Sequence, residues 1–102
     1  MTDGPRRFLS EALVVWAGLG RSAWPSRDDR LVREQFGDDV ATMLLPLIRE
    51  LEEDFYSSSA RFSATELSEM GESAASEFRG RHPEITEEAV RALAWCYTFD
   101  YK

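Results

Sequence analysis

Carboxylates are the functional side chains that this sequence gathers most closely. Six of them fall in two stretches that we expect to be consecutive helices packed antiparallel: Glu50, Glu53, Asp54, Glu66, Glu69 and Glu72. Carboxylates one helical turn apart can bind a cation weakly, but oxygen-rich calcium sites normally wrap a loop. A negative surface that attracts a basic protein fits the pattern better. The plain alternative is six ordinary solvated carboxylates.

Other side chains capable of catalysis occur singly. The chain has one histidine, His82, and one cysteine, Cys96. A di-iron site in a helical bundle needs Glu-x-x-His pairs on facing helices, and a nucleophile–histidine pair would rest on His82 alone. We expect an exposed, ordinary imidazole at His82, which precedes a proline, and a buried reduced thiol at Cys96, which lies in an apolar helical run. The sequence therefore predicts no enzyme, no metal and no cofactor.

Three arginines recur at three-residue spacing before the first acidic stretch: Arg27, Arg30 and Arg33. Guanidinium groups on one side of a helix could clamp a phosphate or a carboxylate. The favoured interpretation is a solvated helix face on which they pair with Asp29 and Glu34.

The helix expected over residues 38–57 has the clearest helical period, and the rest of the chain is organised around it. Spacings of three and four residues place on one face Val40, Leu44, Leu47, Leu51 and Phe55. Burying each such side chain contributes roughly 1.5–3 kcal/mol, so packing on this face decides whether the helix forms. Pro46 cannot donate a hydrogen bond to the carbonyl of Thr42, which predicts a kink at that point. The alternative is a break, with a second helix starting at Leu45 or Pro46.

Two helices are expected before the central one. Pro5 suits a first helical turn, and apolar residues recur at helical spacing until Gly18. Ser26 is the predicted N-cap of a short helix that stops at Gly37. Trp24, in the connector between these two helices, is expected to cover an edge of the core.

Two more helices are expected after the central one. Ser63 and Glu66 have the spacing of a capping box, which predicts a helix starting there, and Phe62 is expected to anchor the preceding connector in the core. Within that helix, Gly71 and the small pair Ala74-Ala75 either mark the close approach of a second helix or weaken this one. Thr86 is the predicted N-cap of the last helix.

The last helix runs into aromatic residues whose period is ambiguous. Trp95, Tyr97, Phe99 and Tyr101 alternate with polar or small residues, as in a strand, but no partner strand is evident. We therefore expect the helix to end near Thr98 and to be followed by an aromatic tail packed on the body.

These patterns predict an all-α fold, with residues 1–102 as a single helical domain. It would be one compact bundle of about five helices, with a kinked central helix at Pro46. At 102 residues the chain can bury a core without a disulfide or a metal. The predicted core consists of Leu13, Trp16, Leu31, Phe36, Leu44, Leu47, Ile48, Leu51, Phe55, Leu67, Phe78, Val90 and Leu93.

Negative charge dominates the chain after residue 37. Residues 1–37 hold six arginines against five acidic residues, whereas residues 38–102 hold six basic against fourteen acidic residues, within a net charge of −7. A field of that sign repels nucleic acid and anionic membranes and favours a basic partner. Net charge also keeps a small protein in solution, and this alone could explain the acidity.

The first residues contain one pattern that bears on location. Arg6-Arg7-Phe8-Leu9 before an apolar run resembles a twin-arginine export signal. Glu11 interrupts the apolar run, and the residue expected between the second arginine and the phenylalanine is missing. No apolar run approaches the roughly 20 residues of a membrane span. We therefore expect a cytoplasmic protein.

Size and acidity together suggest a class of function. In these two properties, though in no motif, the chain resembles bacterial toxin-immunity and inhibitor proteins. The leading hypothesis is a non-enzymatic protein that neutralises a basic partner protein, such as a toxin or nuclease, through its acidic helical face. The alternative is a self-associating scaffold, a homodimer for example, that uses residues 95–101 as its interface. A third hypothesis is a small enzyme or ligand binder with a pocket near Trp16 and Trp24.

Overall fold

A computed structural model of the chain describes residues 8–63 and 65–101, and over these residues it is helical and has no strand. The predicted start of the first helix at Pro5 and the Arg6-Arg7 pair lie outside the described residues. None of the described helices is long and apolar enough to cross a membrane. The helices are α1 (Leu9–Ala17), α2 (Asp29–Phe36), α3 (Asp38–Tyr56), α4 (Ala60–Ser63), α5 (Leu67–Arg81) and α6 (Glu87–Tyr101). Five of these have at least eight residues and α4 is a single turn, so the predicted all-α bundle is confirmed.

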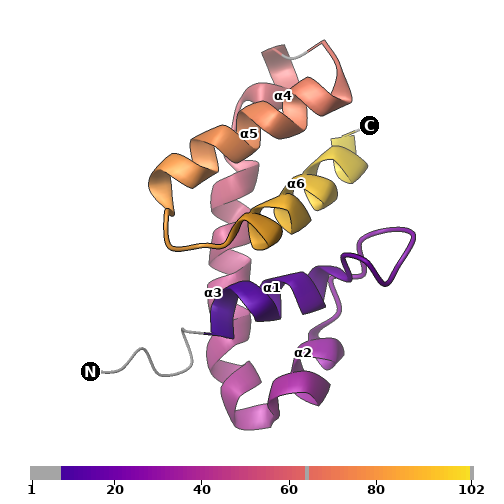
Figure 1. The fold of residues 1–102 in the computed structure, drawn as a ribbon, viewed down its shortest axis with the longest axis vertical. Helices are drawn as coiled ribbons and strands as arrows, with labels where there is room; N and C mark the ends of the chain where they lie inside the picture. The colour runs from indigo at the N-terminus through magenta and orange to yellow at the C-terminus, as the bar shows by residue number, and fades with distance from the viewer. Residues whose placement is uncertain (1–7, 64, 102) are drawn as a thin grey trace.

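The central helix α3 spans most of the long axis of the molecule, and the other helices are arranged along it (Figure 1). It contains Pro46 without interruption, so the alternative of a break at this residue is wrong. Burial of one face offsets the roughly 3 kcal/mol that a proline costs in a helix interior. The buried residues of α3 are Ala41, Leu44, Leu45, Ile48, Leu51 and Phe55.

Two predicted helix starts are wrong by a few residues. Asp28 rather than Ser26 caps α2, because the Asp28 carboxylate accepts a hydrogen bond from the first turn of that helix. The Ser26 hydroxyl instead donates to the carbonyl of Trp16, at 2.8 Å. The capping box is absent, because Ser63 is already helical and ends α4, whereas α5 begins after Glu66. A residue in helical conformation cannot take the extended backbone of an N-cap.

Most of the predicted core residues are buried: Leu13, Trp16, Leu44, Ile48, Leu51, Phe55, Phe78, Val90 and Leu93. Leu31, Phe36 and Leu47 are half-buried. Leu67 is 44% exposed, so its assignment to the core is wrong. Tyr97, which the predicted set omitted, is fully buried and packs its ring against those of Phe55 and Tyr56.

Two aromatic side chains expected to lie against the core are exposed instead. Trp24 is 63% and Phe62 is 77% accessible. The connector after α3 is held by Arg61, whose guanidinium donates hydrogen bonds to the carbonyls of Tyr56 and Ser58 at 3.0 and 2.8 Å. A polar anchor therefore takes the place of the predicted apolar one, and the Phe62 ring lies under the Arg61 guanidinium at 4.5 Å.

The aromatic segment at the end of the chain is helical. α6 continues to Tyr101, past the predicted end near Thr98, so the expected aromatic tail is the last turn of a helix. The carboxylate of Asp100 accepts two hydrogen bonds from Arg27, at 2.7 and 2.8 Å, and one from the Tyr56 hydroxyl, at 2.6 Å. These bonds tie the last turn of α6 to α3 and to the connector between α1 and α2.

α6 packs against α5 and α1, and its packing against α5 is the more extensive of the two. A Cβ atom at Gly71 of α5 would lie 2.8 Å from Cγ2 of Thr98, so only glycine permits this approach. The interpretation of Gly71 as a point of close helix approach is therefore confirmed. At the other end of α6, the backbone N–H of Thr86 donates to the hydroxyl of Ser10 in α1, at 3.0 Å.

Candidate functional site

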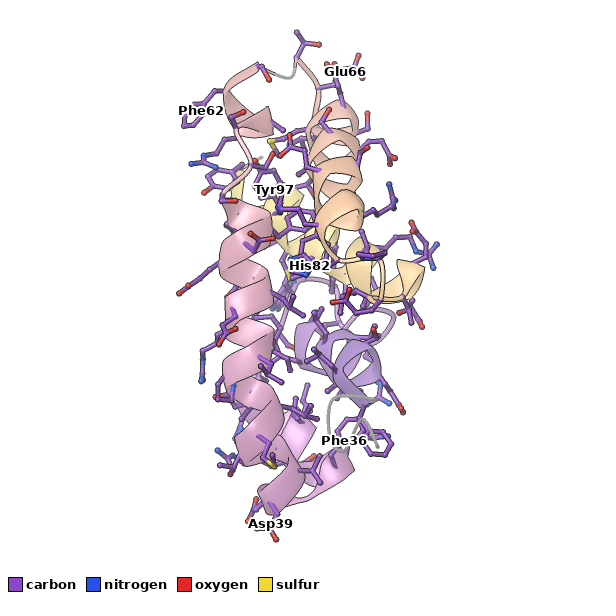
Figure 2. All side chains as sticks on the ribbon, turned by 90° about the vertical axis from the view of Figure 1, so that its left-hand side faces the viewer. Phe36, Asp39, Phe62, Glu66, His82 and Tyr97 are labelled. Carbon is purple, nitrogen blue, oxygen red and sulfur yellow. The ribbon has the colours of Figure 1, made fainter. Side chains whose placement is uncertain are left out.

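The six carboxylates predicted to bind a partner form two groups rather than one patch. Asp54 lies beside the C-terminal end of α5, because its carboxylate contacts Arg81 and His82. Glu66 lies at the opposite end of α5 (Figure 2). The 15 residues of α5 rise roughly 22 Å along its axis. α5 crosses α3 obliquely (Figure 1), and Asp54 and Glu66 lie near opposite ends of α5. We call Glu50, Glu53 and Asp54 the α3 group, and Glu66, Glu69 and Glu72 the α5 group.

Two of the six carboxylates are paired with a cation, and four are not. Asp54 and Glu72 each form an ion pair with an arginine of α5. Arg49 lies one helical turn before Glu53, but it forms its ion pair with Asp29 of α2. No basic side chain of the described residues lies within ion-pair distance of the remaining four carboxylates, which are Glu50, Glu53, Glu66 and Glu69.

A cleft of about 260 Å³ is formed by residues of α1, α3 and the turn that follows α5. Its leucines are buried or half-buried, whereas Glu50 and Glu84 are exposed, so the floor is apolar and the rim is acidic. We call this hollow the acidic cleft. It is lined by Leu9, Leu47, Glu50, Leu51, Asp54, His82 and Glu84.

Asp54 forms a fixed wall of the acidic cleft. Its Oδ2 accepts hydrogen bonds from Nε of Arg81 and from Nε2 of His82, both at 2.8 Å. Burial by itself raises the pKa of Asp54, but these hydrogen bonds outweigh burial and hold the pKa below its ordinary value. The imidazole of His82 also packs on the Phe78 ring, with 4.6 Å between ring centroids. His82 is thus half-buried and held in place, and the expectation of an exposed imidazole is wrong.

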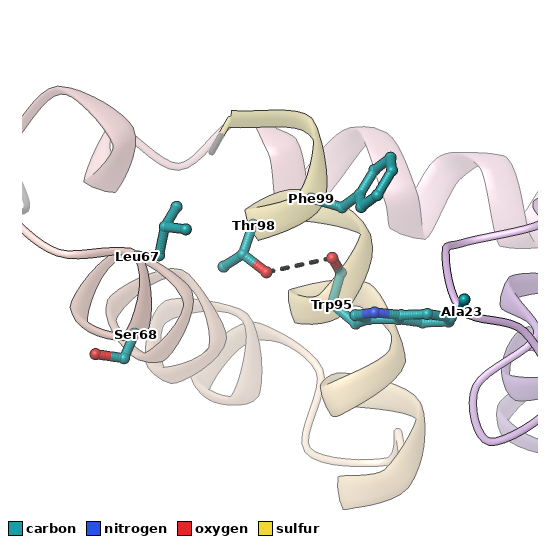
Figure 3. Close-up of a pocket in the computed structure, with 6 residues that line it drawn as sticks. All are labelled: Ala23, Leu67, Ser68, Trp95, Thr98 and Phe99. Carbon is teal, nitrogen blue, oxygen red and sulfur yellow. Dashed lines mark hydrogen bonds between the residues drawn. The ribbon is translucent and has the colours of Figure 1, made fainter.

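A second hollow follows the seam between α5 and α6. It consists of two adjoining parts of about 320 and 300 Å³, which share Leu67, Ser68, Trp95 and Thr98. Figure 3 shows the first part, where Trp95 and Phe99 of α6 lie between Leu67 of α5 and Ala23 of the connector after α1. We call the two parts together the α5/α6 groove. Its remaining lining residues are Gly71, Glu72, Ala75, Arg79, Arg91 and Ala94.

The three arginines at three-residue spacing do not converge on a common point. Arg27 lies in the connector before α2 and binds Asp100 of α6. Arg30 folds back onto the N-cap of its own helix, and Arg33 lies 3.8 Å from Asp38. Each guanidinium therefore has a carboxylate partner within the chain, and their arrangement does not form a clamp.

The structure provides little for nucleophilic or metal chemistry. Burial raises the pKa of the Cys96 thiol to about 12, so at neutral pH the thiol stays protonated and unreactive. Among the described residues, no three His, Cys, Asp or Glu side chains are arranged to hold a metal ion.

The sequence-based predictions missed Glu84 of the acidic cleft. They also missed the α5/α6 groove as a hollow, although they named Glu72 and residues 95–101, which contribute to its lining. The adjacent His82-Pro83 pair indicated a turn at this point, but not that the turn folds back onto α3. The groove depends on how closely α5 and α6 approach, for which Gly71 and the small pair Ala74-Ala75 were the signals in the sequence.

Comparisons with known proteins add no further constraint on function. No protein-family model, curated protein or solved structure matches the chain.

Proposed function

We propose that this chain is a non-enzymatic binding protein that neutralises a basic partner protein, such as a toxin or a nuclease. The observation that carries the proposal is the unpaired charge of Glu50 and Glu53 beside the acidic cleft. These two carboxylates have no basic partner in the described part of the chain, whereas Asp54 on the same helix is paired with Arg81.

Uncompensated carboxylates are suited to steering a partner of opposite charge. Such a surface raises the rate of encounter with a basic protein and disfavours partners of like charge. A basic nuclease would present the surface that normally receives nucleic acid, so a protein bound there would block its activity. We keep the α3 group as the primary contact and the α5 group of Glu66, Glu69 and Glu72 as a second, separate contact. The proposal places the protein in the cytoplasm.

Capture from lysate at two salt concentrations tests this function. The tagged protein should retain a basic protein at low salt and lose it at high salt, because ions screen exposed charges. A Glu50→Lys/Glu53→Lys variant should reduce capture roughly tenfold or more, because like charges facing each other are costly. The matched control is Glu34→Lys/Glu88→Lys, which changes the net charge equally at two other exposed positions. Equal capture by both variants would contradict the proposal.

A second candidate function is self-association through the α5/α6 groove. The observation that favours it is the presence of Trp95 and Phe99 in the groove lining, beside the exposed Leu67. A Leu67→Glu variant should be monomeric in sedimentation equilibrium if the wild type is a dimer. Met43→Glu is the control, since Met43 is 58% exposed on α3 and does not line the groove. Dimerisation through an apolar groove should also persist at high salt, unlike capture of a basic partner.

A further inference from the structure

We infer that the acidic cleft receives one cationic side chain of the partner, a lysine or an arginine. This inference rests on the proposed function and specifies the contact that it uses. At about 260 Å³ the cleft is smaller than the roughly 300–1,000 Å³ of most small-molecule sites. Its size therefore suits a single side chain better than a whole cofactor.

The floor of the cleft matches an aliphatic stem. Leu9 and Leu51 are only 5% and 7% exposed, and with Leu47 they give an apolar surface beneath the rim. Lysine and arginine side chains combine a stem of three or four methylene groups with a charged end group, and they bury the stem while the end group stays at a polar edge. The floor and rim of the cleft reproduce that division.

The rim selects a positive charge. Asp54 is already engaged by Arg81 and His82, so it contributes shape more than attraction. Glu50 has no basic partner in the described part of the chain, and Glu84 lies 3.7 Å from Nδ1 of His82. These two carboxylates come from different elements, α3 and the turn after α5, and both line the cleft. They are placed to accept charge-assisted hydrogen bonds from one ammonium or guanidinium group.

Other occupants fit the cleft less well. An anion would be repelled by Glu50 and Glu84. A purely apolar group would cover these carboxylates without pairing them, which carries a desolvation cost. A hard metal ion needs several oxygen ligands, and no described group of three His, Cys, Asp or Glu side chains is arranged to supply them.

The test is a titration of the labelled full-length chain followed by amide chemical shifts. The probes are N-acetyl-arginine amide and N-acetyl-lysine amide, and the control is N-acetyl-citrulline amide, which resembles the arginine probe in shape but has no charge. We expect saturable shifts around Leu9, Leu51 and His82 with one or both cationic probes and not with citrulline. The stronger of the two cationic probes identifies which side chain the cleft prefers.

Substitutions of the rim carboxylates test whether the chemical-shift changes depend on their charge. Glu50→Gln/Glu84→Gln should weaken binding roughly fivefold to tenfold, because it removes the charge while keeping the shape. The control Glu34→Gln/Glu88→Gln should bind as the wild type does. The inference would be overturned if the cationic probes caused no saturable shifts, or if N-acetyl-citrulline amide caused equal shifts. It would also be overturned if Glu50→Gln/Glu84→Gln bound the cationic probes as strongly as the wild type does.

The cleft and the proposed function can fail separately. If the protein captured a basic protein in a salt-sensitive manner but the cleft bound no cationic probe, the proposed function would be supported and the role of the cleft in it would be contradicted. Cationic binding in the cleft without capture of any basic protein would support the site and count against the proposed function.

Discussion

The acidic cleft and the α5/α6 groove are two hollows that share no lining residue. Both have apolar residues in their lining, but the cleft is edged by Glu50 and Glu84, whereas the groove is edged at one end by Trp95 and Phe99. The cleft is shaped by an ion pair between α3 and the end of α5, and the groove by direct helix contact at Gly71. If the proposed binding functions hold, the two surfaces should respond in opposite ways to salt and to substitution.

The largest effect is expected from a substitution at the contact between α5 and α6 beneath the groove, which should leave the acidic cleft unchanged. Gly71→Ala should lower the free energy of unfolding by about 1–3 kcal/mol, because the new Cβ would lie 2.8 Å from Thr98 Cγ2 in a packed seam. Urea unfolding followed by circular dichroism measures this change. Binding of cationic probes in the acidic cleft should persist in the folded variant.

Gly80→Ala is the matched control for this substitution in the same helix. A Cβ at Gly80 meets no atom within 4 Å, so this change should be neutral or stabilise by up to about 1 kcal/mol through helix propensity. Adding Thr98→Ser to Gly71→Ala removes Cγ2 and should restore part of the loss. If Gly71→Ala and Gly80→Ala behaved alike, the groove would not depend on close helix contact.

A smaller loss of stability is expected from substitution of Asp54, which forms a wall of the acidic cleft. Asp54→Asn should cost about 1–2 kcal/mol of unfolding free energy, because Arg81 and His82 lose a charged acceptor at a partly buried position. Glu53→Gln, on the neighbouring position of the same helix, should change stability by no more than about 0.5 kcal/mol, since no basic side chain of the described residues pairs with Glu53. Thermal unfolding of the two variants at neutral pH compares them directly, and equal losses would contradict the assigned role of Asp54.

The smallest effect is a difference in acid sensitivity. The folded-state pKa of Asp54 is lowered, so its stabilising contribution is complete above the unfolded pKa of about 3.9 and is lost as pH falls through the folded pKa. The wild type should therefore lose stability more steeply below about pH 4 than Asp54→Asn does. A groove variant such as Trp95→Ala should keep the wild-type pH dependence, because it changes no titratable group. Melting temperatures between pH 2.5 and 7 give this comparison.

The helical class and most of the core could be predicted from the sequence, because the apolar residues of α3 repeat at a helical period that burial then enforces. Positions that depend on competing local bonds could not be predicted. Asp28 displaced Ser26 as the cap of α2, and Arg61 anchored a connector that Phe62 was expected to hold. The acidic residues themselves could be identified from the sequence, but the way in which α5 crosses α3 decides which of them lie close together. The cleft depends on a turn that folds back onto a helix nearly thirty positions earlier, a contact with no local signature.

The joining of α6 to α1 and to the connector after it has a consequence for how the protein is made. Ser10 meets Thr86, and Arg27 meets Asp100, so residues translated early are bound by residues translated much later. A ribosome releases the chain from its N-terminus, and α1 then stays partly uncovered until α6 has emerged. α1 is the first of the described helices to be synthesised, and we expect the part of its surface that α6 covers to stay exposed until α6 has been made.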